Sequence, residues 1–106
     1  LHSETTHGDC ALAAYREQVD KDDSDLIHLL SMRSELTREI GTWKENHHLP
    51  ALQSARLESL IHHHRRQAEL YGISPDLVED LFRIIHDYSL TDQIKRLKNE
   101  NHSDKD

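Results

Sequence analysis

The sequence predicts an all-α fold with one long helix and two shorter helices per chain. Apolar residues recur at spacings of three, four and seven, which place them on one face of a helix. The only two prolines, Pro50 and Pro75, lie where successive helices would be separated. No segment alternates apolar and polar residues in the way that a half-buried strand does.

The long helix is expected from about Ala11 to Asn46, a stretch without proline whose only glycine is Gly41. The polar segment Asp20–Asp25 interrupts its apolar face, but one continuous helix is preferred because no helix breaker lies there. Its apolar positions are Leu12, Tyr15, Val19, Leu26, Leu30, Leu36, Ile40 and Trp43. A helix of about 35 residues is roughly 50 Å long. Two shorter helices cannot cover that length in a domain with a radius of gyration of about 13 Å, so dimerisation along the helix is expected.

A loop is expected from His47 to Leu52, because proline disfavours helical structure at the residue before it. The second helix then opens at Gln53 or Ser54, and Gly72 is placed to end it as a C-terminal cap.

Ser74 and Pro75 form a helix start, with serine as the N-cap and proline in the first turn. The third helix is expected to run to about Lys98. The polar segments 1–10 and 99–106 are expected to be disordered tails. Residues 11–98 would then form one helical domain.

Composition narrows the classes of function. The net charge of −7 with neutral histidines argues against nucleic-acid binding, which depends on neutralising phosphates. No apolar run approaches the ~18 residues of a membrane span, and no signal-peptide pattern is present. The single cysteine, Cys10, cannot form an internal disulfide, so a reducing, cytoplasmic compartment is expected. The chain starts at Leu1 rather than Met, which leaves a processed N terminus open.

Two histidine runs, His47–His48 and His62–His64, raise the question of a metal site. Adjacent residues of a helix point about 100° apart, so the triplet cannot ligate one ion. No cysteine or acidic cluster completes a site, and no bound metal is expected.

Several polar residues share helix faces. Arg33 and Lys44 lie eleven positions apart, which separates them by only about 20° around a helix. Ser89 and Gln93 are four positions apart on the third helix and also share a face. Arg56 lies at the beginning of the second helix, just after the loop.

Arg16 is placed differently, since it points about 100° away from Arg33 and lies about 25 Å from it along the axis. It is poorly placed to join such a cluster within its own chain, but in an antiparallel or interlocked dimer it could reach the cluster of the other chain. Each of these residues taken singly is most simply a solvated surface residue. Their order and spacing along the chain make the set informative.

This order and spacing resemble the all-helical class of chorismate mutases. The matching segments are, in chain order, Arg16-Glu17-Gln18 with Asp23, Leu29–Arg33, Glu39–Lys44, Lys44–Pro50, Tyr71–Val78, and Ile84-Ile85 followed by Ser89–Gln93. They run from about Ala14 to Arg96, with Arg56 twelve residues after Lys44. The resemblance implies an interlocked helical homodimer that rearranges chorismate to prephenate, an isomerisation in the shikimate pathway of aromatic amino acid biosynthesis. It implies no cofactor and no metal.

The resemblance also implies the site. Each site would take Arg33, Lys44, Arg56, Ser89 and Gln93 from one chain and Arg16 from the other. Chorismate carries two carboxylates, and arginine binds carboxylates through two parallel hydrogen bonds, so the three arginines are expected to hold the substrate. Lys44 and Gln93 would donate hydrogen bonds to the ether oxygen as its C–O bond breaks.

Two substrate-binding positions depart from the family pattern. The family commonly has Asp three residues before the arginine of the second helix and Glu directly after it, where this chain has Gln53 and Leu57. Leu57 cannot accept a hydrogen bond from the C4 hydroxyl of chorismate, so the substrate stays open. The alternatives are an isochorismate pyruvate lyase, which forms salicylate, and a mutase acting on 4-amino-4-deoxychorismate. An alternative of another class is a non-catalytic helical dimerisation or regulatory domain.

Overall fold

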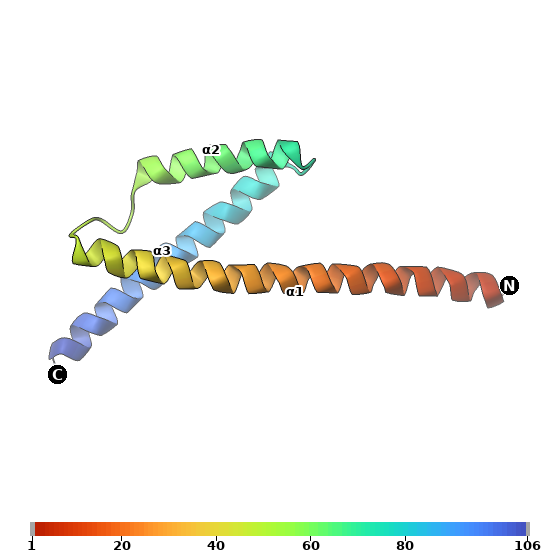
Figure 1. Ribbon diagram of the computed structural model, residues 1–106, viewed down its shortest axis with the longest axis horizontal. Coiled ribbons are helices and arrows are strands. Elements are labelled where there is room, and N and C mark those ends of the chain that lie inside the picture. Colours follow the sequence, from red (N-terminus) through yellow and green to blue (C-terminus); the bar gives the residue numbers. More distant parts are fainter. Residues whose placement is uncertain (1, 106) are drawn as a thin grey trace. The chain divides into compact units, whose positions relative to one another are not determined.

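The computed structural model describes the backbone of residues 2–105 and the side chains of residues 8–98. The chain forms three α-helices, namely α1 (His2–Asn46), α2 (Ser54–Leu70) and α3 (Pro75–Lys105) (Figure 1). No strand occurs in the described backbone, so the predicted all-α class with one long and two shorter helices is confirmed. Contacts divide the chain into two compact units, Leu1–Glu35 and Leu36–Asp106.

Helix α1 is continuous through Asp20–Asp25, as the absence of a breaker residue predicted. It begins at His2, and α3 ends at Lys105, so helical backbone reaches beyond the expected domain of residues 11–98. The disorder of segments 1–10 and 99–106 stays a prediction.

Helix α1 ends in a turn that places a non-glycine residue in the left-handed region. His48 has φ 56°. The N–H of Leu49 donates to the carbonyl of Lys44 at 2.8 Å, and the N–H of His48 donates to the carbonyl of Glu45 at 3.1 Å. These two bonds form a Schellman motif, in which glycine usually holds the left-handed position.

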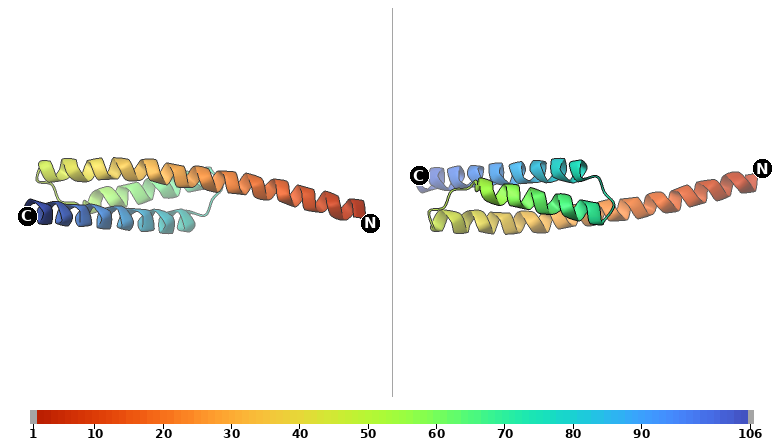
Figure 2. Two further views of the ribbon diagram at one scale, coloured as in Figure 1. Left: turned by 90° about the horizontal axis from the view of Figure 1, so that it is seen from below. Right: turned by 90° about the horizontal axis from the view of Figure 1, so that it is seen from above.

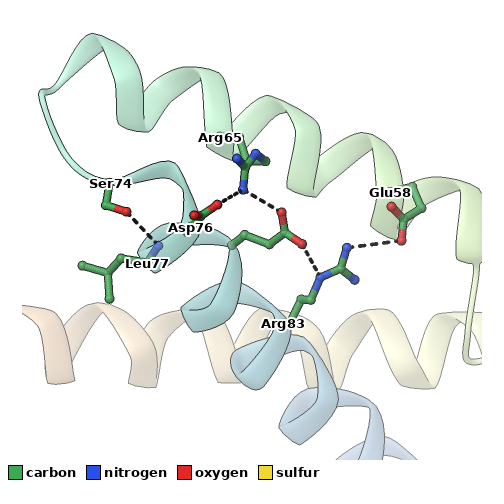
Figure 3. Close-up of polar contacts among 7 residues, drawn as sticks. Glu58, Arg65, Ser74, Asp76, Leu77 and Arg83 are labelled. Carbon is green, nitrogen blue, oxygen red and sulfur yellow. Dashed lines mark hydrogen bonds and ion pairs between the residues drawn. The ribbon is translucent and has the colours of Figure 1, made fainter.

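The turn between α2 and α3 is built from the predicted glycine and serine caps. Gly72 has φ 69°, and the N–H of Ile73 donates to the carbonyl of Ala68 at 2.9 Å. The Oγ of Ser74 accepts the N–H of Leu77 at 3.3 Å, which caps the start of α3 (Figure 3). Both predicted caps are confirmed, and they join α2 and α3 into a helical hairpin.

The interior of the hairpin is small. Ile61 and Ala68, both on α2 and both 3% exposed, are the buried hydrophobic residues of the described part of the chain. The end of α1 lies against α3 (Figure 2). Arg38 of α1 pairs there with Asp92 of α3 at 3.2 Å. Residues 36–46, α2 and the middle of α3 therefore form one packed unit.

An ion-pair ladder runs along the outside of the hairpin (Figure 3). Arg65 of α2 contacts Asp76 at 3.0 Å and Glu79 at 2.9 Å. Glu79 also contacts Arg83 at 2.8 Å, and Arg83 reaches back to Glu58 of α2 at 3.5 Å. Glu79 is thus the carboxylate that links the two arginines.

The ladder makes the hairpin sensitive to acid. Hydrogen bonds from Arg83 and then Arg65 hold the pKa of Glu79 below its ordinary value. Its stabilising contribution is therefore fully present above the unfolded-state pKa of about 4.3, and it is lost as pH falls through the lowered folded-state pKa. Glu79→Gln should lower the melting temperature at pH 7 and narrow the difference between melting temperatures at pH 7 and pH 3.

Circular dichroism melts at both pH values measure this effect. Glu69→Gln, which changes an exposed carboxylate on α2, is the matched control and should leave both melting temperatures near wild type. Equal acid sensitivity in the wild-type protein and Glu79→Gln would contradict the prediction.

Many large apolar side chains are exposed. In residues 1–35 these side chains are Leu12, Tyr15, Val19, Leu26, Ile27, Leu29, Leu30 and Met32. In residues 36–106 they include Leu36, Ile40, Trp43, Leu81, Ile84 and Tyr88. Packing of an apolar face supplies most of a helix's stability in water. These faces are the surface that the dimerisation predicted from the length of α1 would cover.

Candidate active site

The predicted site residues fall in both units of the chain. Arg16 is exposed and Arg33 is half-buried, and both belong to residues 1–35. Desolvation by burial lowers the pKa of the Arg33 guanidinium, which nevertheless stays charged at neutral pH. The other six predicted residues belong to residues 36–106. The structure gives relative positions only for these six residues.

Lys44 lies half-buried near the end of α1. Its Nζ donates a hydrogen bond of 2.9 Å to the backbone carbonyl of Ala51, in the loop that precedes α2. The Schellman turn brings this loop back to Lys44, whose own carbonyl accepts the N–H of Leu49. An ammonium group has three N–H donors, so the Ala51 bond uses one of them. The loop thus fixes the position of the charge.

Gln93 of α3 is the one buried polar side chain among the described residues, at 8% exposure. Its Nε2 donates a hydrogen bond of 2.8 Å to the backbone carbonyl of Thr37 on α1. A carbonyl oxygen can only accept, so the amide must present its nitrogen to Thr37 and cannot be flipped without losing the bond. The same nitrogen carries a second N–H donor.

The remaining four residues lie on α2, before it, or on α3. Ser89 is half-buried, and its Oγ donates to the carbonyl of Ile85 at 3.0 Å. Arg56 is exposed in the first turn of α2, and Leu57 beside it is half-buried. Gln53 is the N-cap residue of α2, but its side chain makes no capping hydrogen bond. An amide, a guanidinium and an apolar side chain are therefore carried by the start of α2.

A cavity of about 50 Å³ lies between α1 and α3. Its lining residues are Arg38, Gly41, Thr42, Glu45, Gln93, Arg96 and Leu97. Gln93 is the one predicted site residue among them. The hydrogen bonds of Lys44, Ser89 and Gln93 described above each end on a backbone carbonyl rather than on another predicted residue.

Sequence reasoning missed the ion pairs beside Gln93. Asp92 Oδ2 lies 3.2 Å from the Nε of Arg38 and 3.2 Å from the Nε of Arg96. The hydrogen bonds from Arg38, first, and from Arg96 lower the pKa of Asp92. The four-residue spacing of Asp92 and Arg96 was visible in the sequence as a helical ion pair. The link to Arg38 was not, because it depends on how α3 lies against α1.

Among the predicted site residues in 36–106, Lys44, Arg56 and Gln93 carry N–H donors. Within residues 8–98 the structure contains no group of three or more histidine, cysteine, aspartate or glutamate side chains placed to hold a metal ion. None of the described helical stretches has the length and apolar character needed to cross a bilayer. Donors of these kinds can stabilise negative charge on a small molecule.

The fold and the site define an all-α protein with tethered ammonium and amide donors, groups that suit an anionic ligand. Comparison with family models identifies the family. Residues 15–94 match the family described as chorismate mutase type II. The match covers most of the chain, and the chain belongs to this family. The resemblance inferred from the motifs is confirmed.

Two bacterial relatives are similar to this chain. The T-protein of Enterobacter agglomerans is 38% identical over 82 residues, which are 77% of this chain and 22% of that protein. The T-protein of Haemophilus influenzae is 38% identical over 73 residues, which are 69% of this chain and 19% of that protein. The chain therefore spans about a fifth of the length of these relatives.

Proposed function

We propose that this chain is a chorismate mutase, an isomerase that converts chorismate to prephenate in aromatic amino acid biosynthesis. The family match over residues 15–94 carries the proposal, because it spans every predicted site residue from Arg16 to Gln93. The reaction breaks the ether C–O bond and forms a C–C bond within one molecule. It therefore needs no proton donor, redox partner or second substrate.

Binding of the substrate is assigned to the arginines. Arg16, Arg33 and Arg56 hold the two carboxylates and so keep the enolpyruvyl side chain folded over the ring. The partial desolvation of Arg33 supports this role, since a charge in a less polar environment interacts more strongly with its counter-charge. Arg56 lies in the first turn of α2 and is exposed, so its guanidinium is accessible to a ligand from solvent.

Stabilisation of the transition state is assigned to Lys44 and Gln93. Negative charge grows on the ether oxygen as the C–O bond breaks, and both side chains donate hydrogen bonds to it. Each donor is already tethered, Lys44 to the Ala51 carbonyl and Gln93 to the Thr37 carbonyl. Donors held in place before the reaction lose little free energy to reorganisation.

A second copy of the chain is proposed to complete each site by supplying Arg16. Two features support the homodimer. The apolar side chains of residues 1–35 are exposed, and the 45-residue α1 is too long for two shorter helices to cover. We also propose a cytoplasmic location, which is supported by the single, exposed Cys10.

The substituent at C4 of the ring distinguishes a second candidate substrate. Leu57 is a half-buried apolar residue next to Arg56, and it offers no acceptor for a C4 hydroxyl. Gln53, with no capping bond, presents an amide in place of a carboxylate. Because of these two residues, isochorismate and 4-amino-4-deoxychorismate should be compared with chorismate as substrates.

The decisive experiment follows the three substrates with purified protein. Loss of chorismate absorbance with formation of prephenate supports the proposal. Higher kcat/KM for isochorismate with release of salicylate, detected by its fluorescence, would favour the lyase instead. Higher kcat/KM for the amino analogue would favour the third substrate. Turnover of none of the three would favour a non-catalytic dimerisation or regulatory domain.

A further inference from the structure

Helix α1 contains two glycines in very different surroundings. A Cβ built at Gly41 would lie 2.8 Å from the Cγ of Gln93 and 3.1 Å from its Cδ. In the described part of the chain, nothing lies within 4 Å of a Cβ built at Gly8. Glycine weakens the interior of a helix, so a glycine at position 41 is explained by the close approach of α3.

The missing side chain creates the space in which Gln93 lies. The side chain of Gln93 is 8% exposed and passes over Gly41 so that its Nε2 reaches the Thr37 carbonyl at 2.8 Å. Thr37 and Gly41 are four positions apart on α1 and so present one face to α3. A buried side chain with a fixed hydrogen bond has little room to move away from an added methyl group.

We infer that Gly41 is a positioning residue, because its missing Cβ is what allows the Gln93 amide to be held on Thr37 with its second N–H directed to the substrate. This inference rests on the proposed function of Gln93 as a donor to the ether oxygen. Any side chain at position 41 displaces that amide. The arginines that bind the carboxylates are unaffected, so the loss falls on the chemical step rather than on substrate binding.

Gly41→Ala tests the inference, with Gly8→Ala as the matched control. We expect Gly41→Ala to lower kcat by about 100-fold with KM within about three-fold of wild type, the scale expected for a misplaced transition-state donor. Gly8→Ala should leave both constants at wild-type values. Alanine favours helix more than glycine, so the melting temperature of Gly41→Ala can rise or fall and is not the readout.

The same substitution in a Gln93→Ala background separates positioning from general damage. If Gly41 acts through the amide, Gly41→Ala should cause no further loss of kcat where the amide is already absent. The vacated space also accommodates the added methyl group, so this double variant is expected to fold. A further loss of about 100-fold in this background would overturn the inference.

A spectroscopic readout keeps the inference separate from the proposed function. In ¹H–¹⁵N NMR spectra, the side-chain amide of Gln93 should show a shifted and slowly exchanging N–H in the wild-type protein and in Gly8→Ala. That signature should be lost in Gly41→Ala whether or not the protein turns over any substrate. An unchanged Gln93 amide signal in Gly41→Ala would overturn the inference, whereas absence of wild-type turnover would overturn only the proposed function.

Discussion

Lys44→Ala should lower kcat for chorismate by about 10³-fold while the protein remains helical and keeps the proposed dimer. The ammonium of Lys44 is held 2.9 Å from the Ala51 carbonyl, which fixes it before the substrate arrives. Removing one fixed donor to a developing oxyanion typically costs between about 10²-fold and 10³-fold in rate, and the positive charge lost here places the effect at the upper end. Stopped assays of prephenate formation measure kcat, and circular dichroism checks the helical content.

The matched control is Lys95→Ala, which removes an exposed lysine from α3. It changes the net charge by the same amount and should leave kcat near wild type. Near wild-type kcat in Lys44→Ala would refute the electrostatic mechanism, because no other cation is assigned to the ether oxygen.

The same variant tests whether each site is shared between two chains. Arg16→Ala and Lys44→Ala should each be nearly inactive alone. When equal amounts are mixed, unfolded and refolded, half of the dimers are hybrids, and each hybrid regains one complete site if Arg16 acts across the interface. The mixture should therefore recover about a quarter of wild-type activity. No recovery would place Arg16 in its own chain's site, whereas near wild-type activity of Arg16→Ala alone would place it outside any site.

Gln93→Glu should convert an activity that is nearly independent of pH from about 6 to 8 into one that is lost as pH rises. The side chain at position 93 is buried and faces the Thr37 carbonyl at 2.8 Å, an arrangement that a carboxyl can satisfy only when protonated. Burial and the carbonyl both raise the pKa of the introduced carboxyl. We expect kcat at pH 8 to be about 100-fold below wild type, with recovery towards pH 5.

The stability of Gln93→Glu should fall as pH rises, as its activity does. A carboxyl whose folded-state pKa is raised contributes stability that is present below its unfolded-state pKa of about 4.3 and is lost as pH rises through the folded-state value. The melting temperature of Gln93→Glu should therefore fall relative to wild type between pH 5 and pH 8. Gln93→Ala is the control, since its kcat should be low throughout this range. A flat pH profile for Gln93→Glu would mean that position 93 does not donate to the ether oxygen.

Helix boundaries were largely predictable because they depend on neighbours in the chain. Gly72, Ser74 and Pro75 each act through their own backbone angles or through bonds within four residues, and the structure uses them as expected. His48 was not predictable as the left-handed residue at the end of α1, because glycine usually holds that position. Pro50 predicted the loop, but it did not predict the geometry of the turn that precedes it.

The sequence predicts the fold class, the order of the three helices and the family, because apolar periodicity, caps and motif spacing are properties of local stretches of chain. It also identified Lys44 and Gln93 as candidate donors. The packing of the helices reveals what holds these donors, since Gln93 contacts Thr37 across a separation of 56 residues. It likewise shows that Gly41, in the sequence only the one glycine of the expected long helix, is the position that admits Gln93. Such contacts depend on how α3 crosses α1, and a crossing is set by the packing of whole faces rather than by any one segment.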